Sequence, residues 1–407
     1  MIISAPVDLN GNPGKTQPEP DADPPFGVNE MRLSARQWLA TAAIFLVCAV
    51  AIPWAWKRAE RFDTGSDYRL PYALSSDYWL YQRRLEGVRD RGEAIPVLGD
   101  SVVWGEYVRR GGTLSHFLNR ETGSADRFVN CGVNGVFPLA MEGLIAQYGA
   151  ALHDRKVIVH FNALWMSSPK ADLSAPEEQT FNHTKLVPQF FERIPCYRAD
   201  ASARLDAVAE RSVGLFGWVN HLDTVYFDQR SIPRWTLEED DSGYPLRAPR
   251  SPNAWRNPLS RITLTVPGEP ENDPQRGPSS PRHKPWNAKG AAPTHFDWVR
   301  LEESLQWKSF RRSIALLRAR GNDVLVIVGP FNESMVAEDQ RPDYRKLRDG
   351  VNAWLTANRV AHIVPEALPS ALYADASHPL TEGYALLAGH IARDPAFRQW
   401  AQFTPLQ

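Results

Sequence analysis

The sequence of 407 residues has few of the residues that usually mark a metal, redox or nucleotide site. It contains three cysteines and no C-x-x-C pair, and it lacks a metal-spaced histidine cluster and a phosphate-cradling glycine loop. Basic and acidic residues nearly balance, with 46 lysines and arginines against 47 aspartates and glutamates, and no basic patch stands out. We therefore expect no cofactor, no metal and no nucleic-acid partner.

The cysteines leave the redox environment open. Cys48 falls inside an apolar run, so Cys131 and Cys196 are the two that could pair. Two interpretations remain: a disulfide formed in an oxidising compartment, or two buried free thiols.

One long uncharged segment near the N-terminus has the composition of a membrane anchor. Residues 1–30 are polar and contain several prolines, which predicts a disordered tail. Residues 38–56 then run for 19 residues without a charge, and as a helix they would span about 28 Å, close to the roughly 30 Å hydrocarbon core of a bilayer. Trp38 and Trp56 at its ends fit an interfacial belt. We favour a single-pass anchor over a cleaved signal peptide or a buried core helix.

The charges on either side of this segment bear on its orientation. Arg32 and Arg36 precede it, whereas Lys57, Arg58 and Arg61 follow it. By the positive-inside rule, this excess favours a cytoplasmic location for the residues after the segment.

The remainder of the chain alternates between apolar runs of strand length and longer segments of helical pattern. Strands are expected at residues 95–98, 128–131, 157–161, 324–328 and 362–364. Helices are expected near residues 113–121, 138–152, 297–320, 342–358 and 380–392. Runs rich in valine and isoleucine, each followed by a helix, predict an α/β fold with a central parallel sheet covered on both faces. Ligands of such sheets bind beyond the carboxyl ends of the strands.

A long insertion at residues 167–295 separates the third expected strand from the fourth. Its first part has helical character around residues 199–218. Its second part, residues 233–293, holds twelve prolines and little periodicity, which predicts an irregular and partly disordered segment. We therefore expect a discontinuous domain of residues 75–166 and 296–400, with the insertion either shaping substrate access or elaborating the surface.

The first expected strand leads into the sequence G-D-S at residues 99–101. A serine at the carboxyl end of a strand, where a helix begins, lies among backbone N–H groups that can stabilise a developing oxyanion. Far downstream, the sequence D-A-S-H-P at residues 375–379 offers a base and a carboxylate to orient it. Two independent motifs in this order favour Ser101 as a nucleophile, with His378 as its base and Asp375 as the orienting carboxylate.

These motifs resemble those of the SGNH (GDSL) hydrolase family, with the similarity covering residues 90–165 and 300–395. The resemblance implies a three-layer, flavodoxin-like fold and a catalytic triad of Ser101, Asp375 and His378. It also implies an oxyanion hole made by the N–H groups of Ser101 and Gly135 and the side-chain amide of Asn162. Gly132 is a less favoured choice for the glycine of this hole.

The third sequence block departs from the family pattern. The family has Gly-x-Asn-Asp, whereas this chain has H-F-N-A at residues 160–163. Asn162 can still supply a side-chain N–H donor, but a glycine and an acidic residue are missing from the pocket. Phe161, Leu164 and Trp165 either make that pocket more apolar or belong to the core. His160 is the one other histidine expected near the site.

The resemblance implies a serine hydrolase that acts on acyl esters through an acyl-enzyme. Water attacking this intermediate gives an esterase, for example one that deacetylates an envelope polysaccharide, whereas a sugar hydroxyl gives an O-acyltransferase acting on an extracytoplasmic glycan. Membrane-tethered members of the family usually face the periplasm or cell exterior, so the resemblance places the catalytic domain outside the cytoplasm, against the charge pattern. A catalytically silent scaffold that binds glycan or protein is the alternative of another class, and the complete set of triad residues argues against it.

Overall fold

The computed structural model describes residues 33–237, 256–268 and 282–402, so the predicted tail at residues 1–30 lies outside the described residues. The chain divides into two compact units, Met1–Ala49 and Val50–Gln407. The described part of the larger unit contains one parallel sheet of five strands: β1 (Ile95–Gly99), β2 (Phe128–Gly132), β3 (Lys156–Phe161), β4 (Asp323–Val328) and β5 (Ala361–Ile363). The strand order is β2-β1-β3-β4-β5, as in flavodoxin-type doubly wound sheets. The predicted α/β class and parallel sheet are confirmed, and each strand end lies within one residue of its predicted position.

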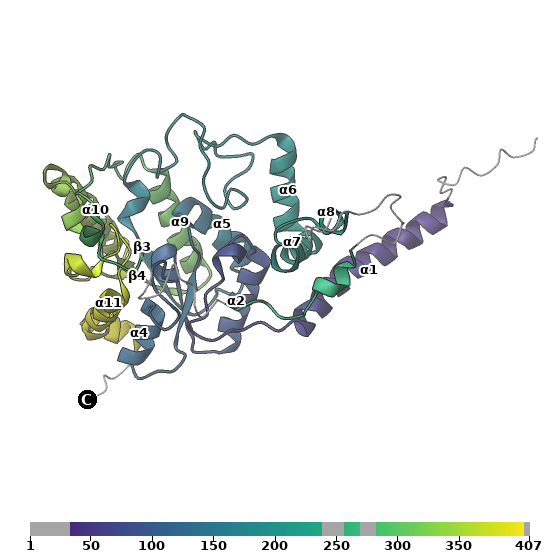
Figure 1. Ribbon diagram of the computed structural model, residues 1–407, viewed down its shortest axis with the longest axis horizontal. Helices are drawn as coiled ribbons and strands as arrows, with labels where there is room; N and C mark the ends of the chain where they lie inside the picture. The colour runs from purple at the N-terminus through teal and green to yellow at the C-terminus, as the bar shows by residue number, and fades with distance from the viewer. Residues whose placement is uncertain (1–32, 238–255, 269–281, 403–407) are drawn as a thin grey trace, which may run out of the picture. The chain divides into compact units, whose positions relative to one another are not determined.

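Helices cover both faces of this sheet (Figure 1). One face is covered by α4 (Leu114–Glu121), α11 (Thr381–Arg393) and α12 (Pro395–Ala401). The other is covered by α2 (Tyr78–Asp90), α5 (Pro138–Tyr148), α9 (Leu305–Ala319) and α10 (Arg341–Ala357). Successive side chains of a strand point to opposite faces, so Val324 and Val326 of β4 join one core, whereas Leu325 and Ile327 join the other. The continuous apolar runs seen in the sequence follow from this double burial.

Two helices differ from the expectations. The helix predicted at residues 297–320 begins only at Leu305, because Ser304 caps it by accepting the N–H of Trp307 and the residues before it are not helical. Helix α2 is absent from the predicted helices. Its buried face includes Arg84, which donates to backbone carbonyl oxygens, and this charged residue interrupts the apolar periodicity.

Helix α1 (Ala35–Ala59) has 25 residues and includes the apolar run predicted as an anchor. It is long and apolar enough to cross a membrane, a property that signal sequences near an N-terminus also have. None of its side chains is buried, which is not the pattern of a core helix.

The insertion contributes three α-helices in its described part: α6 (Ala201–Ser212), α7 (Gly214–Tyr226) and α8 (Ile232–Leu237). The helix expected around residues 199–218 is therefore two helices, which meet at the extended backbone of Val213. Within the predicted irregular segment 233–293, the described residues form the rest of α8 and two short 3-10 helices, η3 (Pro258–Arg261) and η4 (Trp286–Lys289). Residues 238–255 and 269–281 lie outside the described residues.

A buried cluster of charges holds α7 against the first residues of the larger unit. Nδ1 of His221 on α7 lies 2.7 Å from an oxygen of Asp77, and its Nε2 lies 2.9 Å from an oxygen of Glu60. Burial by itself would lower the pKa of His221, but the two carboxylates raise it to about 9. Arg83 and the hydroxyl of Tyr226 also bind Glu60, so the charges in this cluster compensate one another.

The two cysteines that could pair are both buried free thiols, which is the second of the two interpretations. Cys131 lies in β2 and Cys196 lies in the insertion. Burial raises the pKa of the Cys131 thiol to about 11, and the positive charge of Arg84 offsets only part of that rise. Cys131 therefore remains protonated and behaves as an apolar core residue.

The end of β2 carries a glycine on which the short helix α3 (Ser101–Trp104) packs directly. β1 and β2 pair with Gly99 opposite Gly132. A Cβ atom on Gly132 would overlap the backbone nitrogen of Trp104 and lie 2.8 Å from the carbonyl carbon of Val103. Only a residue without a side chain permits this approach. The position of α3, and with it that of Ser101, therefore depends on Gly132.

Gly132→Ala should lower the free energy of unfolding by about 1–3 kcal/mol, because the added methyl group must push α3 away from β2. Gly214→Ala at the start of α7 is the matched control, since a Cβ atom there meets no atom within 4 Å. The control should change the free energy of unfolding by less than about 0.5 kcal/mol. Urea unfolding of the full chain in detergent, followed by tryptophan fluorescence, measures both variants. Equal stability of the two variants would contradict the close approach of α3 to β2.

Candidate active site

Ser101 lies just beyond the carboxyl end of β1, as the first residue of α3. The preceding residue, Asp100, caps this short helix by accepting the N–H of Val102 at 3.0 Å. The hydroxyl of Tyr384 on α11 donates to the carbonyl oxygen of Val102 at 2.6 Å and holds α3 from another side. The other three residues of α3 are buried, whereas Ser101 is partly exposed. The Ser101 side chain is therefore accessible on a firmly held turn.

The three residues predicted as a triad contact one another. Nε2 of His378 lies 2.8 Å from Oγ of Ser101, and its Nδ1 lies 2.8 Å from both carboxylate oxygens of Asp375. One of these oxygens also accepts the backbone N–H groups of Ser377 and His378 at 2.9 Å each. Because the carboxylate faces Nδ1, the proton belongs on Nδ1, and Nε2 can accept the proton of the serine hydroxyl.

The charges of the site shift the pKa values of both partners of Ser101. Burial by itself would raise the pKa of Asp375, but the charge of His378 and the hydrogen bonds to Asp375 lower it well below its ordinary value. Burial by itself would lower the pKa of His378, but the charge and hydrogen bond of Asp375 oppose burial, and the pKa of His378 is raised. The carboxylates of Asp100 and Glu106 add to that rise. Asp375 therefore stays ionised, and His378 is a stronger base than a free imidazole.

One wall of the site comes from residues 282–290 of the insertion. Tyr107 packs edge-on against the imidazole of His378, with ring centroids 5.3 Å apart. Nζ of Lys289 lies 5.1 Å from the centroid of the Tyr107 ring and donates to the carbonyl oxygen of Ala374 at 3.0 Å. Burial lowers the pKa of Lys289, and the negative charge of Asp375 opposes this effect. The ammonium group of Lys289 thus lies close enough to Asp375 to offset part of its charge.

The carboxylate of Asp100 connects the end of β1 with the residues that follow β3. It accepts the side-chain amide N–H of Asn162 at 2.8 Å and the indole N–H of Trp165 at 2.9 Å. Nδ1 of the buried His160 lies 3.7 Å from its other oxygen. Burial would raise the pKa of Asp100, but the facing His160 and the amide of Asn162 contribute to lowering it. Asp100 is therefore an ionised carboxylate in the interior, and His160 lies beside it in the core.

Three N–H donors are free to bind a ligand near this edge of the sheet. The N–H groups of Ser101 and Gly135 have no hydrogen-bond acceptor among the described residues. The amide nitrogen of Asn162 has two N–H groups, and only one of them is bound, to Asp100. Gly135 (φ 73°) follows the end of β2, which pairs with β1. Gly132 instead donates its N–H to the side chain of Asn130 at 3.0 Å, which disfavours it as an oxyanion donor.

The residues predicted for the site differ in how directly they contact one another. Ser101, His378 and Asp375 form direct contacts, and Asn162 is joined to them through Asp100. Gly135 lies on the neighbouring strand-to-helix turn, between β2 and α5.

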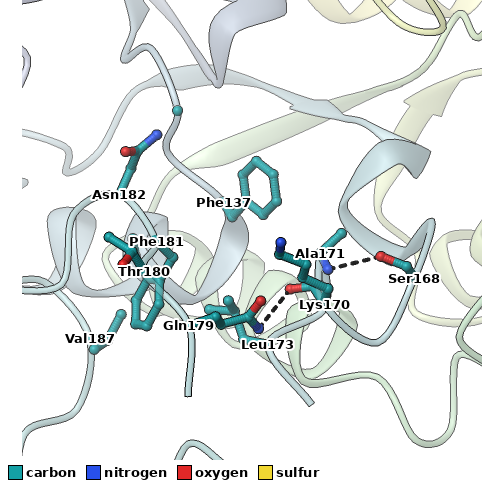
Figure 2. A pocket seen from close by; sticks show the side chains of 12 residues that line it. Phe137, Ser168, Lys170, Ala171, Leu173, Gln179, Thr180, Phe181, Asn182 and Val187 are labelled. Atoms are coloured by element: carbon teal, nitrogen blue, oxygen red, sulfur yellow. Dashed lines mark hydrogen bonds between the residues drawn. The ribbon is translucent and has the colours of Figure 1, made fainter. Parts of the chain in front are cut away.

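A cavity of about 380 Å³ opens beside Gly135 (Figure 2). Its walls come from Phe137 and Ala140 at the start of α5 and from residues 168–187 of the insertion. The insertion therefore bounds the site at two places, at this cavity and at the wall beside Tyr107.

Several residues of the site are missing from the sequence-based prediction. Asp100 is part of the G-D-S motif, and its fixed place before Ser101 is a signal that could have identified it. Lys289 and His283, whose Nδ1 lies 2.8 Å from the carbonyl oxygen of Tyr107, come from the proline-rich segment, where no pattern indicates contact with the triad. Phe161 and Trp165 are fully buried and belong to the core, which was one of the two interpretations offered for them.

No protein-family model matches this chain, and no curated protein matches its sequence. A functional assignment therefore rests on the geometry of the site itself.

Lys289→Met should shift the pH dependence of Ser101 reactivity. His378 must be neutral to accept the hydroxyl proton, so the reaction rate should rise with pH through the pKa of His378, which lies above the ordinary histidine value. Removing the ammonium group near Asp375 leaves this carboxylate less compensated and favours the protonated imidazole. The midpoint should therefore move to higher pH by about half a unit.

The rate of inactivation by a fluorophosphonate, measured from about pH 5 to about pH 9, gives this midpoint. Lys289→Arg keeps the positive charge and serves as the control with an unchanged midpoint. If the Met and Arg variants share the wild-type midpoint, the charge of Lys289 has no influence on the triad.

Proposed function

We propose that this chain is a serine hydrolase of acyl esters, of the SGNH type, held at a membrane by α1. The observation that carries the proposal is the line of contacts from Ser101 Oγ to His378 Nε2 and from His378 Nδ1 to Asp375, each 2.8 Å long. A hydroxyl, a base and an orienting carboxylate at these distances are the parts that nucleophilic acyl transfer requires.

The reaction follows from the roles of these groups. Oγ of Ser101 attacks the carbonyl carbon of the ester while His378 takes the hydroxyl proton, and the C=O bond becomes a single bond to an oxyanion. The N–H groups of Ser101 and Gly135 and the second N–H of Asn162 stabilise this oxyanion. His378 then returns the proton to the alcohol as the ester bond breaks, which leaves an acyl group on Ser101. Water deprotonated by His378 attacks the acyl-enzyme, releases the acid and restores the serine.

Two features support the SGNH type within this proposal. In the strand order β2-β1-β3-β4-β5, β2 lies on one side of β1 and the later strands lie on the other. Doubly wound sheets bind ligands at the carboxyl end of the strands where the order changes in this way. The nucleophile, the amide donor and the His-Asp pair follow β1, β3 and β5 respectively. His160 replaces the glycine of the family pattern, and its side chain is accommodated beside Asp100 in the core.

Ser101→Ala should abolish covalent labelling by a fluorophosphonate, because the probe reacts with a serine whose hydroxyl proton is removed by a neighbouring base. The wild-type chain and Ser212→Ala, a change at an exposed serine of α6, should both be labelled. Labelled protein is measured by in-gel fluorescence and the site by peptide mass spectrometry. Absence of label on the wild-type chain, or equal label on Ser101→Ala, would contradict the nucleophile and favour a silent scaffold.

We further propose that the larger unit lies outside the cytoplasm, with α1 as a single-pass anchor. Ala201→Cys introduces an exposed thiol at the start of α6, whereas Cys131 and Cys196 are buried and Cys48 lies in the apolar run. A membrane-impermeant maleimide should label this variant equally in intact and lysed cells, and the wild-type chain in neither. Labelling that requires lysis would place the larger unit in the cytoplasm, as the flanking charges alone favour.

A further inference from the structure

Helix α7 of the insertion packs against the last turn of α1. Trp56, in the part of α1 that belongs to the larger unit, lies edge-on to the rings of Trp218 and Tyr226, with ring centroids 5.6 and 6.0 Å apart. Trp56 ends the apolar run 38–56, so a bilayer spanned by this run has the boundary of its hydrocarbon core at Trp56. The headgroup layer beyond that boundary is roughly 5–8 Å thick. A helix in contact with Trp56 therefore lies at the level of the lipid headgroups.

Residues 258–266 of the insertion are held at the same level. Nε of Arg261, the last residue of η3, donates to the carbonyl oxygen of Tyr226 at 3.0 Å. The N–H of Arg61, two residues past α1, donates to the carbonyl oxygen of Leu264 at 2.9 Å. Both α7 and the segment around η3 thus contact the chain where α1 ends.

These two segments expose large apolar side chains. Phe216 and Val219 on α7, Leu259 in η3 and Leu264 after it are exposed, Leu259 to 72%. The opposite side of α7 carries His221, which is buried against residues that precede β1, so Phe216 and Val219 face away from those residues. Exposed apolar residues scattered singly over a surface are ordinary. An apolar helix side at the level of the headgroups is instead the pattern of helices that lie in a membrane interface.

The exposed charges around these side chains have one sign. Within the described residues 50–61, 211–226 and 256–268, Arg58, Arg61 and Arg261 are exposed, whereas no aspartate or glutamate is. Arg261 also binds the carboxylate of Asp228. The acidic residues 238–241 that follow α8 lie outside the described residues, and α8 is left out of the surface. Arginines beside exposed apolar side chains match a bilayer that contains anionic lipid.

We propose that Phe216, Val219, Leu259 and Leu264 insert into the headgroup region of the bilayer beside α1, as a second membrane contact of the chain. The inference rests on the proposed anchor α1 and is independent of the chemistry at Ser101. A single spanning helix leaves the unit that it carries free to pivot over the membrane. A second contact, on the insertion, fixes one orientation of the larger unit against the lipid surface.

Spin labels on the full chain in vesicles of phosphatidylcholine and phosphatidylglycerol test this contact. Phe216→Cys and Leu259→Cys each receive a nitroxide, in a background where Cys48→Ala removes the exposed native cysteine. Power-saturation EPR compares collisions with oxygen, which concentrates in lipid, and with a water-soluble nickel chelate. Phe191→Cys is the control, because Phe191 is 89% exposed and lies outside the two segments. The oxygen-to-nickel ratio should be about fivefold higher at the two test sites than at the control.

The lipid headgroups should matter as well. In vesicles of phosphatidylcholine alone, the ratio at both test sites should fall by about twofold, because the arginines lose their anionic partners. An unchanged ratio contradicts the recognition of anionic lipid.

Two results overturn the membrane contact itself. The first is a ratio at Phe216→Cys and Leu259→Cys equal to that of the control, which places these sites in water. The second is slow collision with both reagents, which means that protein, such as a second copy of the chain, covers the surface.

Vesicle flotation separates this inference from the proposed anchor. Chain that does not float with the vesicles contradicts both α1 as an anchor and the second contact. Chain that floats with water-accessible nitroxides contradicts the second contact alone. Fluorophosphonate labelling of Ser101 in the same vesicles tests the hydrolase separately.

Discussion

The buried carboxylate of Asp100 is the interaction on which the rest of the site depends. A carboxylate in the interior is tolerated only when hydrogen bonds replace its water. Asp100 meets this requirement with the N–H of Val102, the amide of Asn162 and the indole of Trp165. The first of these bonds starts α3 and so places Ser101. The second holds the amide of Asn162 at the end of β1, so the same charge positions both the proposed nucleophile and a proposed oxyanion donor.

The sequence was informative wherever the signal was local. Strands such as β3 and β4 are runs of valine and isoleucine buried on both faces, and their ends were predicted to within one residue. The contact between His378 and Asp375 also follows from local order, because Asp375 lies three residues before His378 in a closed turn. The alternation of strands and helices predicts parallel strands. Because β1 and β3 pair in parallel, their carboxyl ends lie at the same edge of the sheet.

The parts that could not be predicted depend on packing between distant segments. Arg84 interrupts the apolar face of α2, and its burial is compensated by carbonyl oxygens that only the fold brings near it. The start of α9 depends on the cap supplied by Ser304, a single residue inside a segment of mixed pattern. His221 is compensated by Glu60 and Asp77, both of them more than a hundred residues away in the sequence. The contacts of this buried histidine join α7 of the insertion to the segment before β1, and no local pattern indicates that.

The electrostatics of the site follow from placing one imidazole near several carboxylates. Asp375 and Asp100 both favour the charged form of His378, which is the form that arises when Ser101 loses its proton. The same charges reduce the fraction of His378 that is neutral at a given pH. Carboxylates that stabilise the imidazolium therefore leave less of the neutral imidazole that can accept the serine proton. Lys289 donates to the carbonyl oxygen of Ala374, next to Asp375, and we expect its positive charge to act against this loss of neutral imidazole. A residue of the insertion is therefore expected to adjust the base strength of the proposed triad, which follows the strands of the sheet.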